Sequence, residues 1–139
     1  MIVAYIDGGA RGNPGPAGYG VRVESADGAI LDELHGALGV ATNNVAEYRG
    51  LLAALQWAIE HDAKRVHIRA DSELLVKQMR GEYRVKNAGL QPLYVRARLL
   101  VAQLDDVRFE HVGRELNTEA DRLSNLGMDE AEQQLKKTC

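Results

Sequence analysis

Four acidic residues occupy positions from which their side chains could share one chemical site. Asp7 interrupts an apolar run, Asp71 follows a second one, Glu47 lies on the apolar stripe of an amphipathic segment, and Asp121 falls in the first turn of a late helix. Gathering several carboxylates in a partly buried place is costly unless cations compensate for the charge. Hard oxygen ligands suit Mg²⁺ or Mn²⁺, and two such ions together perform phosphoryl chemistry on a phosphodiester.

Each acid taken alone also has a structural explanation. Asp7 could form a turn, Asp71 could cap a helix, and the other two could interact with helix dipoles. These explanations are weaker when all four acids are considered together. The single cysteine and four scattered histidines do not form the usual ligand spacings of a structural zinc site.

The periodicity of apolar residues predicts an α/β domain with a mixed sheet, in the order β-β-β-α-β-α-α-β-α. The expected strands are Ile2–Ile6, Tyr19–Ser25, Ala29–Gly36, Arg65–Asp71 and Asp106–Val112. The expected helices are Thr42–Ala63, Ser72–Gly81, Tyr94–Gln103 and a last helix from about Asn117.

This order of elements brings the four acids toward one edge of the sheet. The first and fourth strands should be parallel and joined by a right-handed crossover, so that Asp7 and Asp71 both lie at carboxyl ends of strands. Ligands of open α/β sheets bind at that edge. Glu47 begins the helix that covers the same sheet, and Asp121 begins the last helix.

Length and composition predict one globular domain over residues 1–139, with 45% hydrophobic and 27% charged residues. The net charge is −3, but four metal-bound acids would leave −3 + 4 = +1, which does not exclude a polyanionic ligand. Cys139 is the only cysteine, so no intramolecular disulfide is expected. A strand at Ile2 leaves no room for a signal peptide, and no apolar run approaches a membrane span of ~20 residues. We therefore expect a cytoplasmic protein that does not bind membranes.

Four segments, in this order, resemble the acidic blocks of type 1 ribonucleases H. They are "DGGARGNPGPAGYG", "TNNVAEYRGLLAAL", "ADSELLV" and "NTEADRLSN", and the similarity extends over residues 2–126. The resemblance implies a ribonuclease H-like fold, core order β-β-β-α-β-α-β-α, with strand order 3-2-1-4-5. It also implies a monomeric endoribonuclease that hydrolyses the RNA strand of RNA–DNA hybrids with two Mg²⁺ ions, or Mn²⁺ as a substitute. The expected products carry 5′-phosphate and 3′-hydroxyl ends.

The resemblance assigns roles residue by residue. The metal-binding and catalytic acids are Asp7, Glu47, Asp71 and Asp121. The expected contacts to the hybrid's minor groove, where RNA displays its 2′-hydroxyls, are Asn13, Asn43 and Asn44. Thr42 and Asn87 correspond to a pair that grips a phosphate of the DNA strand, although Asn87 is equally interpretable as a turn former. The glycines of the first block are expected to let the backbone approach the RNA strand.

The sequence also departs from the family pattern. The long basic insertion that many members carry after the second helix is missing from "QMRGEYRVKNAGL", and Val40 replaces an arginine often found near the phosphate grip. The family's mobile histidine has two candidate replacements. His111 should be a partly buried strand residue, whereas Arg114 lies in a loop and is predicted to act on the phosphate.

Two other functions stay open on the sequence. One is a related exonuclease or junction resolvase, which the "TNN…E" and "GNPGP" segments disfavour because such relatives need only the acids. The other is a non-catalytic module that binds hybrids, which predicts the loss of at least one acid.

Overall fold

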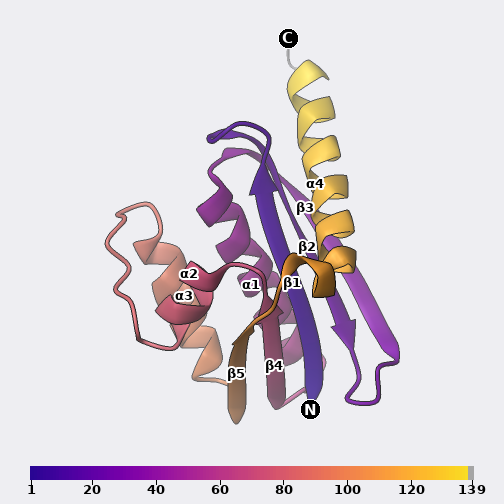
Figure 1. The fold of residues 1–139 in the computed structure, drawn as a ribbon, viewed down its shortest axis with the longest axis vertical. Helices are drawn as coiled ribbons and strands as arrows, with labels where there is room; N and C mark the ends of the chain where they lie inside the picture. Colours follow the sequence, from indigo (N-terminus) through magenta and orange to yellow (C-terminus); the bar gives the residue numbers. More distant parts are fainter. Residues whose placement is uncertain (138–139) are drawn as a thin grey trace.

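The computed structural model describes residues 1–137 and contains a five-stranded sheet flanked by helices (Figure 1). The strands are β1 (Ile2–Ala10), β2 (Gly15–Glu24), β3 (Ile30–Ala41), β4 (Arg65–Ala70) and β5 (Asp106–His111). The helices are α1 (Asn43–Glu60), α2 (Glu73–Met79), α3 (Gln91–Val101), the short 3₁₀ helix η1 (Arg114–Leu116) and α4 (Thr118–Lys137).

The sheet has the order β3-β2-β1-β4-β5, which confirms the expected fold. Strands β1, β2 and β3 form an antiparallel meander, and β1, β4 and β5 are parallel. The crossover from β1 to β4 contains α1. The parallel pairing of β1 with β4 ends at Ile6 opposite Ala70, so Asp7 and Asp71 are the next residues of two neighbouring chains.

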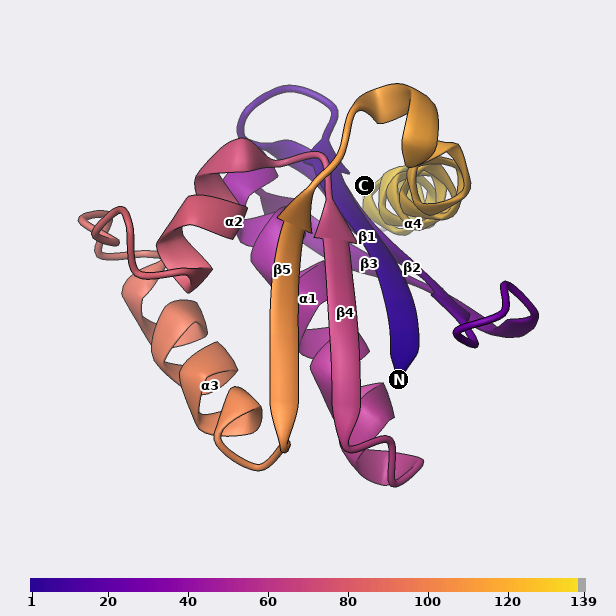
Figure 2. The same ribbon diagram turned by 60° about the horizontal axis from the view of Figure 1, so that its bottom comes forward.

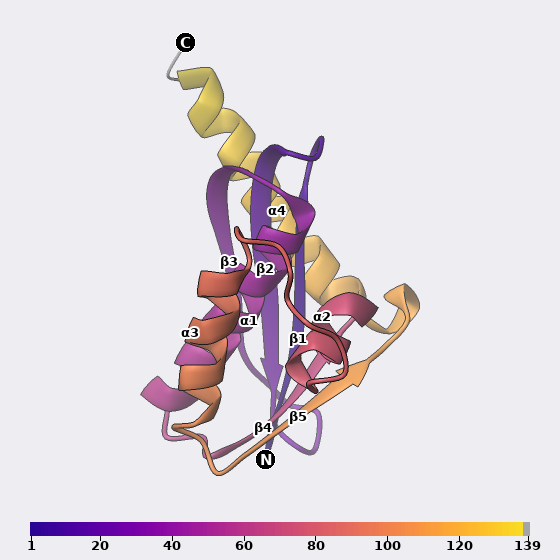
Figure 3. The same ribbon diagram turned by 90° about the vertical axis from the view of Figure 1, so that its left-hand side faces the viewer.

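Helices pack on opposite faces of the sheet (Figures 2 and 3). Gly8 of β1 faces the backbone of α1, whereas Gly20, which pairs with Asp7, faces the backbone of α4. Successive residues of a strand point to opposite faces, which places α1 and α4 on different sides. The core lies mainly between the sheet and α1, and its largest fully buried side chains include Ile6, Tyr48, Leu51, Leu55 and Ile68.

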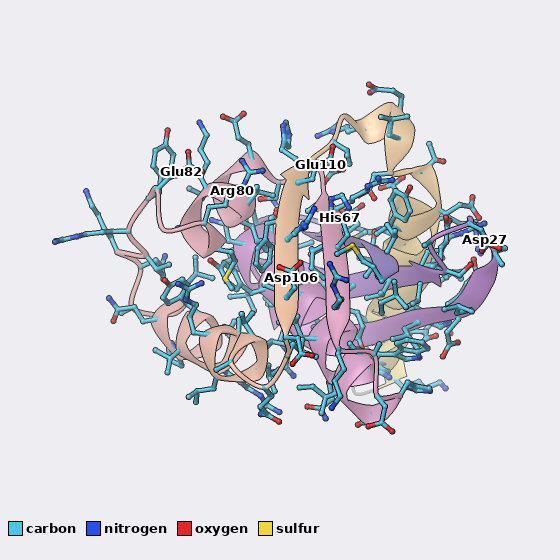
Figure 4. The ribbon with its side chains drawn as sticks, turned by 90° about the horizontal axis from the view of Figure 1, so that it is seen from below. Asp27, His67, Arg80, Glu82, Asp106 and Glu110 are labelled. Carbon is cyan, nitrogen blue, oxygen red and sulfur yellow. The ribbon has the colours of Figure 1, made fainter. Side chains whose placement is uncertain are left out.

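The outer face of β4 and β5 is polar and has no helix in front of it (Figures 2 and 4). Glu110 Oε1 lies 3.0 Å from His67 Nε2 and 3.1 Å from Arg69 Nε. At the free edge of β5, the Arg80 guanidinium donates to the carbonyl of Phe109, with Nη2 at 2.6 Å. The face is therefore suited to contact with solvent. Arg80 binds a carbonyl group that an edge strand would otherwise leave free to pair with another chain.

Four elements are longer than their local sequence predicts. Strand β1 does not end near Asp7 but continues to Ala10, and strand β2 begins at Gly15 rather than Tyr19. Strand β3 continues to Ala41, and α3 begins at Gln91 rather than Tyr94. Tertiary pairing explains the first difference. Residues 7–10 pair with residues 17–20 of β2 and stay extended although "DGGA" has low strand propensity.

The glycines of the first block have a structural role that the sequence analysis missed. A Cβ atom on Gly8 would overlap the backbone of Ala46 and Glu47, and one on Gly20 would overlap the backbone of Ala120 and Ser124. These glycines thus let α1 and α4 approach β1 and β2 closely, on either side of Asp7. The close packing of α1 and α4 explains these two glycines without the expected approach of RNA.

We expect Gly8→Ala to destabilise the fold by about 2–3 kcal/mol, because rigid backbone faces the added methyl group and helix α1 must shift. Gly9→Ala is the matched control. Its Cβ would meet the flexible end of Met128 at 3.4 Å and Asn43 Oδ1 at 3.9 Å, which are ordinary contacts with side chains. Urea unfolding of both variants measures the difference, and equal losses would show that the close approach of α1 does not require Gly8.

Residues 80–90 connect α2 to α3 directly. No helix among residues 1–137 is long and apolar enough to cross a membrane. Cys139, on which the expectation about disulfides rested, lies outside the described residues.

Candidate active site

A cavity of about 640 Å³ opens at the carboxyl end of β1 and β4. The four predicted acids all line it: Asp7, Glu47, Asp71 and Asp121. Arg114 and Asn43 line it as well. The structure therefore brings together side chains from a strand, two helices and the segment after β4, as the sequence predicted.

Packing and local hydrogen bonds fix the two most buried carboxylates. The Asp7 side chain accepts a hydrogen bond from its neighbour, with 2.8 Å between Gly8 N and Oδ1. Glu47 accepts a hydrogen bond from the hydroxyl of Ser72, which also caps α2 by accepting from Leu75 N at 3.2 Å. The second oxygen of Glu47, Oε2, is buried and has no hydrogen-bond partner in the described part of the chain.

Burial and mutual repulsion make these carboxyl groups hard to ionise without a cation. Burial, followed by the charge of Asp71, raises the pKa of Asp7 to about 8. Burial also raises the pKa of Glu47 to about 7, although the bond from Ser72 opposes the shift. The pKa of Asp71 is raised by burial, and a hydrogen bond from Asn117 and the charge of Arg114 oppose this. Perturbed carboxyl groups in one cavity are typical of functional sites.

The cavity is suited to divalent cations that keep waters or substrate oxygens among their ligands. It is not suited to a metal that protein side chains enclose completely. Among residues 1–137, no group of three or more His, Cys, Asp or Glu side chains could hold a metal ion by itself. Mg²⁺ is usually bound through one or two carboxylates, with waters and substrate phosphates as its other ligands. The partnerless Glu47 Oε2 and the crowding of Asp7 by acids supply the negative charge that such an ion would neutralise. The residues present therefore fit Mg²⁺ or Mn²⁺.

Sequence reasoning missed two neutral residues that bind the acids. Ser72 holds Glu47, and Asn117, which is 1% exposed, donates to the Ile6 carbonyl with 2.9 Å between Nδ2 and O. Serine and asparagine are common residues at the start of a helix. The residue types of Ser72 and Asn117 therefore did not indicate any role beside the acids. Only the tertiary contacts show that each also reaches an acid.

Comparisons with known proteins agree with this arrangement. A family model described as "Reverse transcriptase-like" matches residues 5–127. The structure of LC11-RNase H1, solved in complex with an RNA/DNA hybrid, superposes with a TM-score of 0.89 at 39% identity, covering 94% of this chain and 99% of that one. The chain belongs to the ribonuclease H family.

Other members of the ribonuclease H family are similar over most of this chain. Ribonuclease HI of Halobacterium salinarum is 43% identical over 94% of this chain and 65% of its own length. The bifunctional protein Rv2228c of Mycobacterium tuberculosis is 50% identical over 95% of this chain. The present chain spans only 36% of that relative's length. The structure of its N-terminal ribonuclease H domain has a TM-score of 0.93 at 49% identity, covering 96% of this chain and 97% of that one.

Most of the residues predicted to contact substrate in this ribonuclease H fold also make local structural bonds. Asn13 Oδ1 accepts from Asn43 N at 3.0 Å, and Asn43 Oδ1 accepts from Ala10 N at 2.7 Å. Thr42 caps α1 by accepting from Val45 N at 3.3 Å. These bonds lock the β1–β2 loop to the start of α1, beside the cavity. They leave the amide nitrogens of both asparagines without a bond to the described chain.

The remaining two predicted contact residues differ in their surroundings. Asn44 is exposed in the first turn of α1. Asn87 is exposed in the α2–α3 connection, and its Oδ1 accepts from Gly89 N at 2.7 Å, which is the bond of a turn former. A second cavity, of about 530 Å³, is lined by Ala41 and Gly89, near Thr42 and Asn87 in the chain. Neither predicted contact is tested by this geometry, and both stay predictions.

The two candidates for the mobile histidine of the family lie in different places. His111 is the last residue of β5, which confirms its prediction as a strand residue, but it is exposed, so its predicted partial burial was wrong. As the last residue of the edge strand it has no neighbouring strand on its outer side. It interacts electrostatically with Glu73. Arg114 lines the cavity and lies in η1 rather than in an irregular loop.

Proposed function

We propose that this chain hydrolyses the RNA strand of RNA–DNA hybrids and leaves 5′-phosphate and 3′-hydroxyl ends. The observation that carries the proposal is the cavity at the carboxyl end of β1 and β4, in which four acids from separate elements meet. Membership of the ribonuclease H family supports the same reaction. The partner is therefore an RNA–DNA hybrid, and we propose that the chain acts as a monomer in the cytoplasm.

The acids that would hold the metal are Asp7, Glu47, Asp71 and Asp121. Two Mg²⁺ ions, or Mn²⁺ in their place, would supply activation of a water and stabilisation of the leaving oxygen. Ser72 keeps Glu47 oriented, and Gly8 and Gly20 let α1 and α4 bring their acids to Asp7. Arg114, on the same cavity wall, is suited to neutralise charge on the scissile phosphate.

Recognition of the hybrid would use the residues that surround this cavity. Asn13 and Asn43 would donate through their free amide nitrogens, and Asn44 is exposed nearby, so all three are suited to contact 2′-hydroxyls and base edges in the minor groove. Thr42 and Asn87 would hold a phosphate of the DNA strand.

The decisive experiment compares labelled RNA–DNA hybrid, duplex RNA and duplex DNA as substrates, each with and without Mg²⁺. We expect cleavage of the RNA strand of the hybrid only, and only with the metal. Internal cleavage separates this activity from an exonuclease, which would shorten the strand from one end. Binding of the hybrid without any cleavage would instead identify a non-catalytic module.

We expect hybrid binding to be weak and to depend only modestly on salt. Residues 80–90 stand where many family members are expected to carry a long basic insertion. The exposed cations of this connection are Arg80, whose guanidinium donates to Phe109 O, Arg84 and Lys86. Few phosphates should therefore be neutralised, and the slope of log K against log salt should be about −3. A slope near −8 would contradict the prediction. Inserting a basic segment after the exposed Gly81 should lower KM more than it changes kcat.

A further inference from the structure

Asn117 connects the three chain segments that carry Asp7, Asp71 and Asp121. Its side-chain nitrogen donates to the carbonyl of Ile6, the residue before Asp7, at 2.9 Å. Its side chain also lies near Asp71 and, as a donor, lowers the pKa of that carboxyl group. Its backbone carbonyl accepts the first hydrogen bond of α4, from Asp121 N at 3.0 Å. A single residue thus contacts the supports of three acids.

The burial of Asn117 shows that it does not act as a surface contact. Its exposed fraction is 1%, and its Oδ1 is buried without a hydrogen-bond partner in the described chain. Leaving a buried amide oxygen without a partner costs about 1–3 kcal/mol. Leucine would avoid that cost but could not donate to two oxygens at once. The donor capacity of the amide is therefore what the site uses.

The chain segments that Asn117 connects would separate without it. Asp7 and Asp71 follow the last pair of the β1–β4 ladder, so no further strand pairing holds them together. Asp7 and Asp71 line the same cavity, and two ionised carboxylates that share a cavity repel one another. A neutral donor that bridges Ile6 O and Asp71 opposes that separation without adding charge to the cavity.

We propose that Asn117 is a positioning residue that holds Asp7, Asp71 and Asp121 at the spacing that divalent ions and the scissile phosphate require. The inference rests on the proposed nuclease function. Asn117 touches neither substrate nor metal in this role and acts only through the acids. Changes to residues that orient metal ligands typically cost about 10–100-fold in metal affinity or activity.

The test compares Asn117→Ala with Gln78→Leu. Gln78 is the other buried amide among residues 1–137, 4% exposed, and its side chain accepts from the Tyr48 hydroxyl at 2.7 Å. Both variants should unfold at lower temperature, since each loses a buried hydrogen bond. Only Asn117→Ala should also raise the Mg²⁺ concentration for half-maximal activity by about tenfold and lower kcat with little change in KM.

A second readout does not depend on activity. Mg²⁺ should raise the thermal midpoint of the wild type and of Gln78→Leu by similar amounts, because an ion that binds only the folded state stabilises it. The rise should be much smaller for Asn117→Ala. If that variant does not fold, Asn117→Ser, which keeps one donor, should show the same defects to a lesser degree.

The outcomes separate this inference from the proposed function. Wild-type protein that gains stability with Mg²⁺ but cleaves no hybrid would refute the nuclease while the Asn117 comparison by thermal shift still stands. Asn117→Ala or Asn117→Ser with normal metal dependence and normal kcat below its unfolding temperature would show that Asn117 is only structural, and would overturn the inference.

Discussion

Replacing Asp7 with asparagine should reduce hybrid cleavage by on the order of a thousandfold or more, a loss of about 4 kcal/mol in transition-state stabilisation. Asp7 lies where β1 leaves its pairing with β4, in the cavity that also contains Asp71, Glu47 and Asp121. Both proposed ions would depend on this carboxylate. Asparagine has nearly the same shape, so the variant tests charge and not packing.

The same variant should not be less stable when metal is absent. Burial and the charge of Asp71 raise the pKa of Asp7 to about 8, so the folded state holds a proton that the unfolded chain, with an ordinary pKa of 3.8, releases. The contribution of Asp7 to the stability of the metal-free wild type is therefore fully present below about pH 4 and is lost as the pH rises toward 8. Asp7→Asn removes this loss, and its unfolding midpoint at pH 8 should equal or exceed that of the wild type.

Calorimetry at pH 5 and pH 8, with and without Mg²⁺, measures both effects. Mg²⁺ should stabilise the wild type at pH 8 and have little effect on Asp7→Asn. Near-normal turnover by the variant would refute the assignment of Asp7 as a shared metal ligand. A large loss of stability at pH 8 would refute the electrostatic account of its raised pKa.

Replacing Arg114 with alanine should lower kcat by about tenfold or more, equivalent to about 1.4 kcal/mol. The guanidinium lines the acid cavity, and its charge opposes the rise in the pKa of Asp71. Arginine side chains do not serve as bases in proteins, so this one would act by neutralising phosphate charge. Arg114→Lys keeps the charge and should retain more activity than Arg114→Ala.

Two control variants isolate this role. Arg108→Ala removes an arginine from β5 that pairs with Asp106 and lies outside the cavity lining, and kcat should not change. His111→Ala changes an exposed residue at the end of the same strand, so its stability should stay within about 0.5 kcal/mol of the wild type. A pH–rate inflection near ~6.5 that disappears in His111→Ala would transfer the role from Arg114 to His111.

The sequence by itself determined the type and order of the main elements and the identity of the four acids. Strand β4 alternates between buried and more exposed residues, helix α1 carries a long apolar stripe, and Asp71 directly follows β4. Glu47 was identifiable because an acid on a core-facing stripe is unusual. These signals are local. The resemblance of four short segments to type 1 ribonucleases H added the strand order and the expected roles of the residues.

The tertiary structure alone decided how the acids are held. Residues 7–10 have low strand propensity, yet pairing with β2 keeps them extended. The glycines of the first block were expected to serve the approach of RNA, but in the structure helix backbones lie directly against Gly8 and Gly20. The sequence predicts Asn117 only as the start of a helix. In the structure its side chain lies between Ile6 and Asp71. Each of these contacts joins residues far apart in the chain, so no pattern within one segment records it.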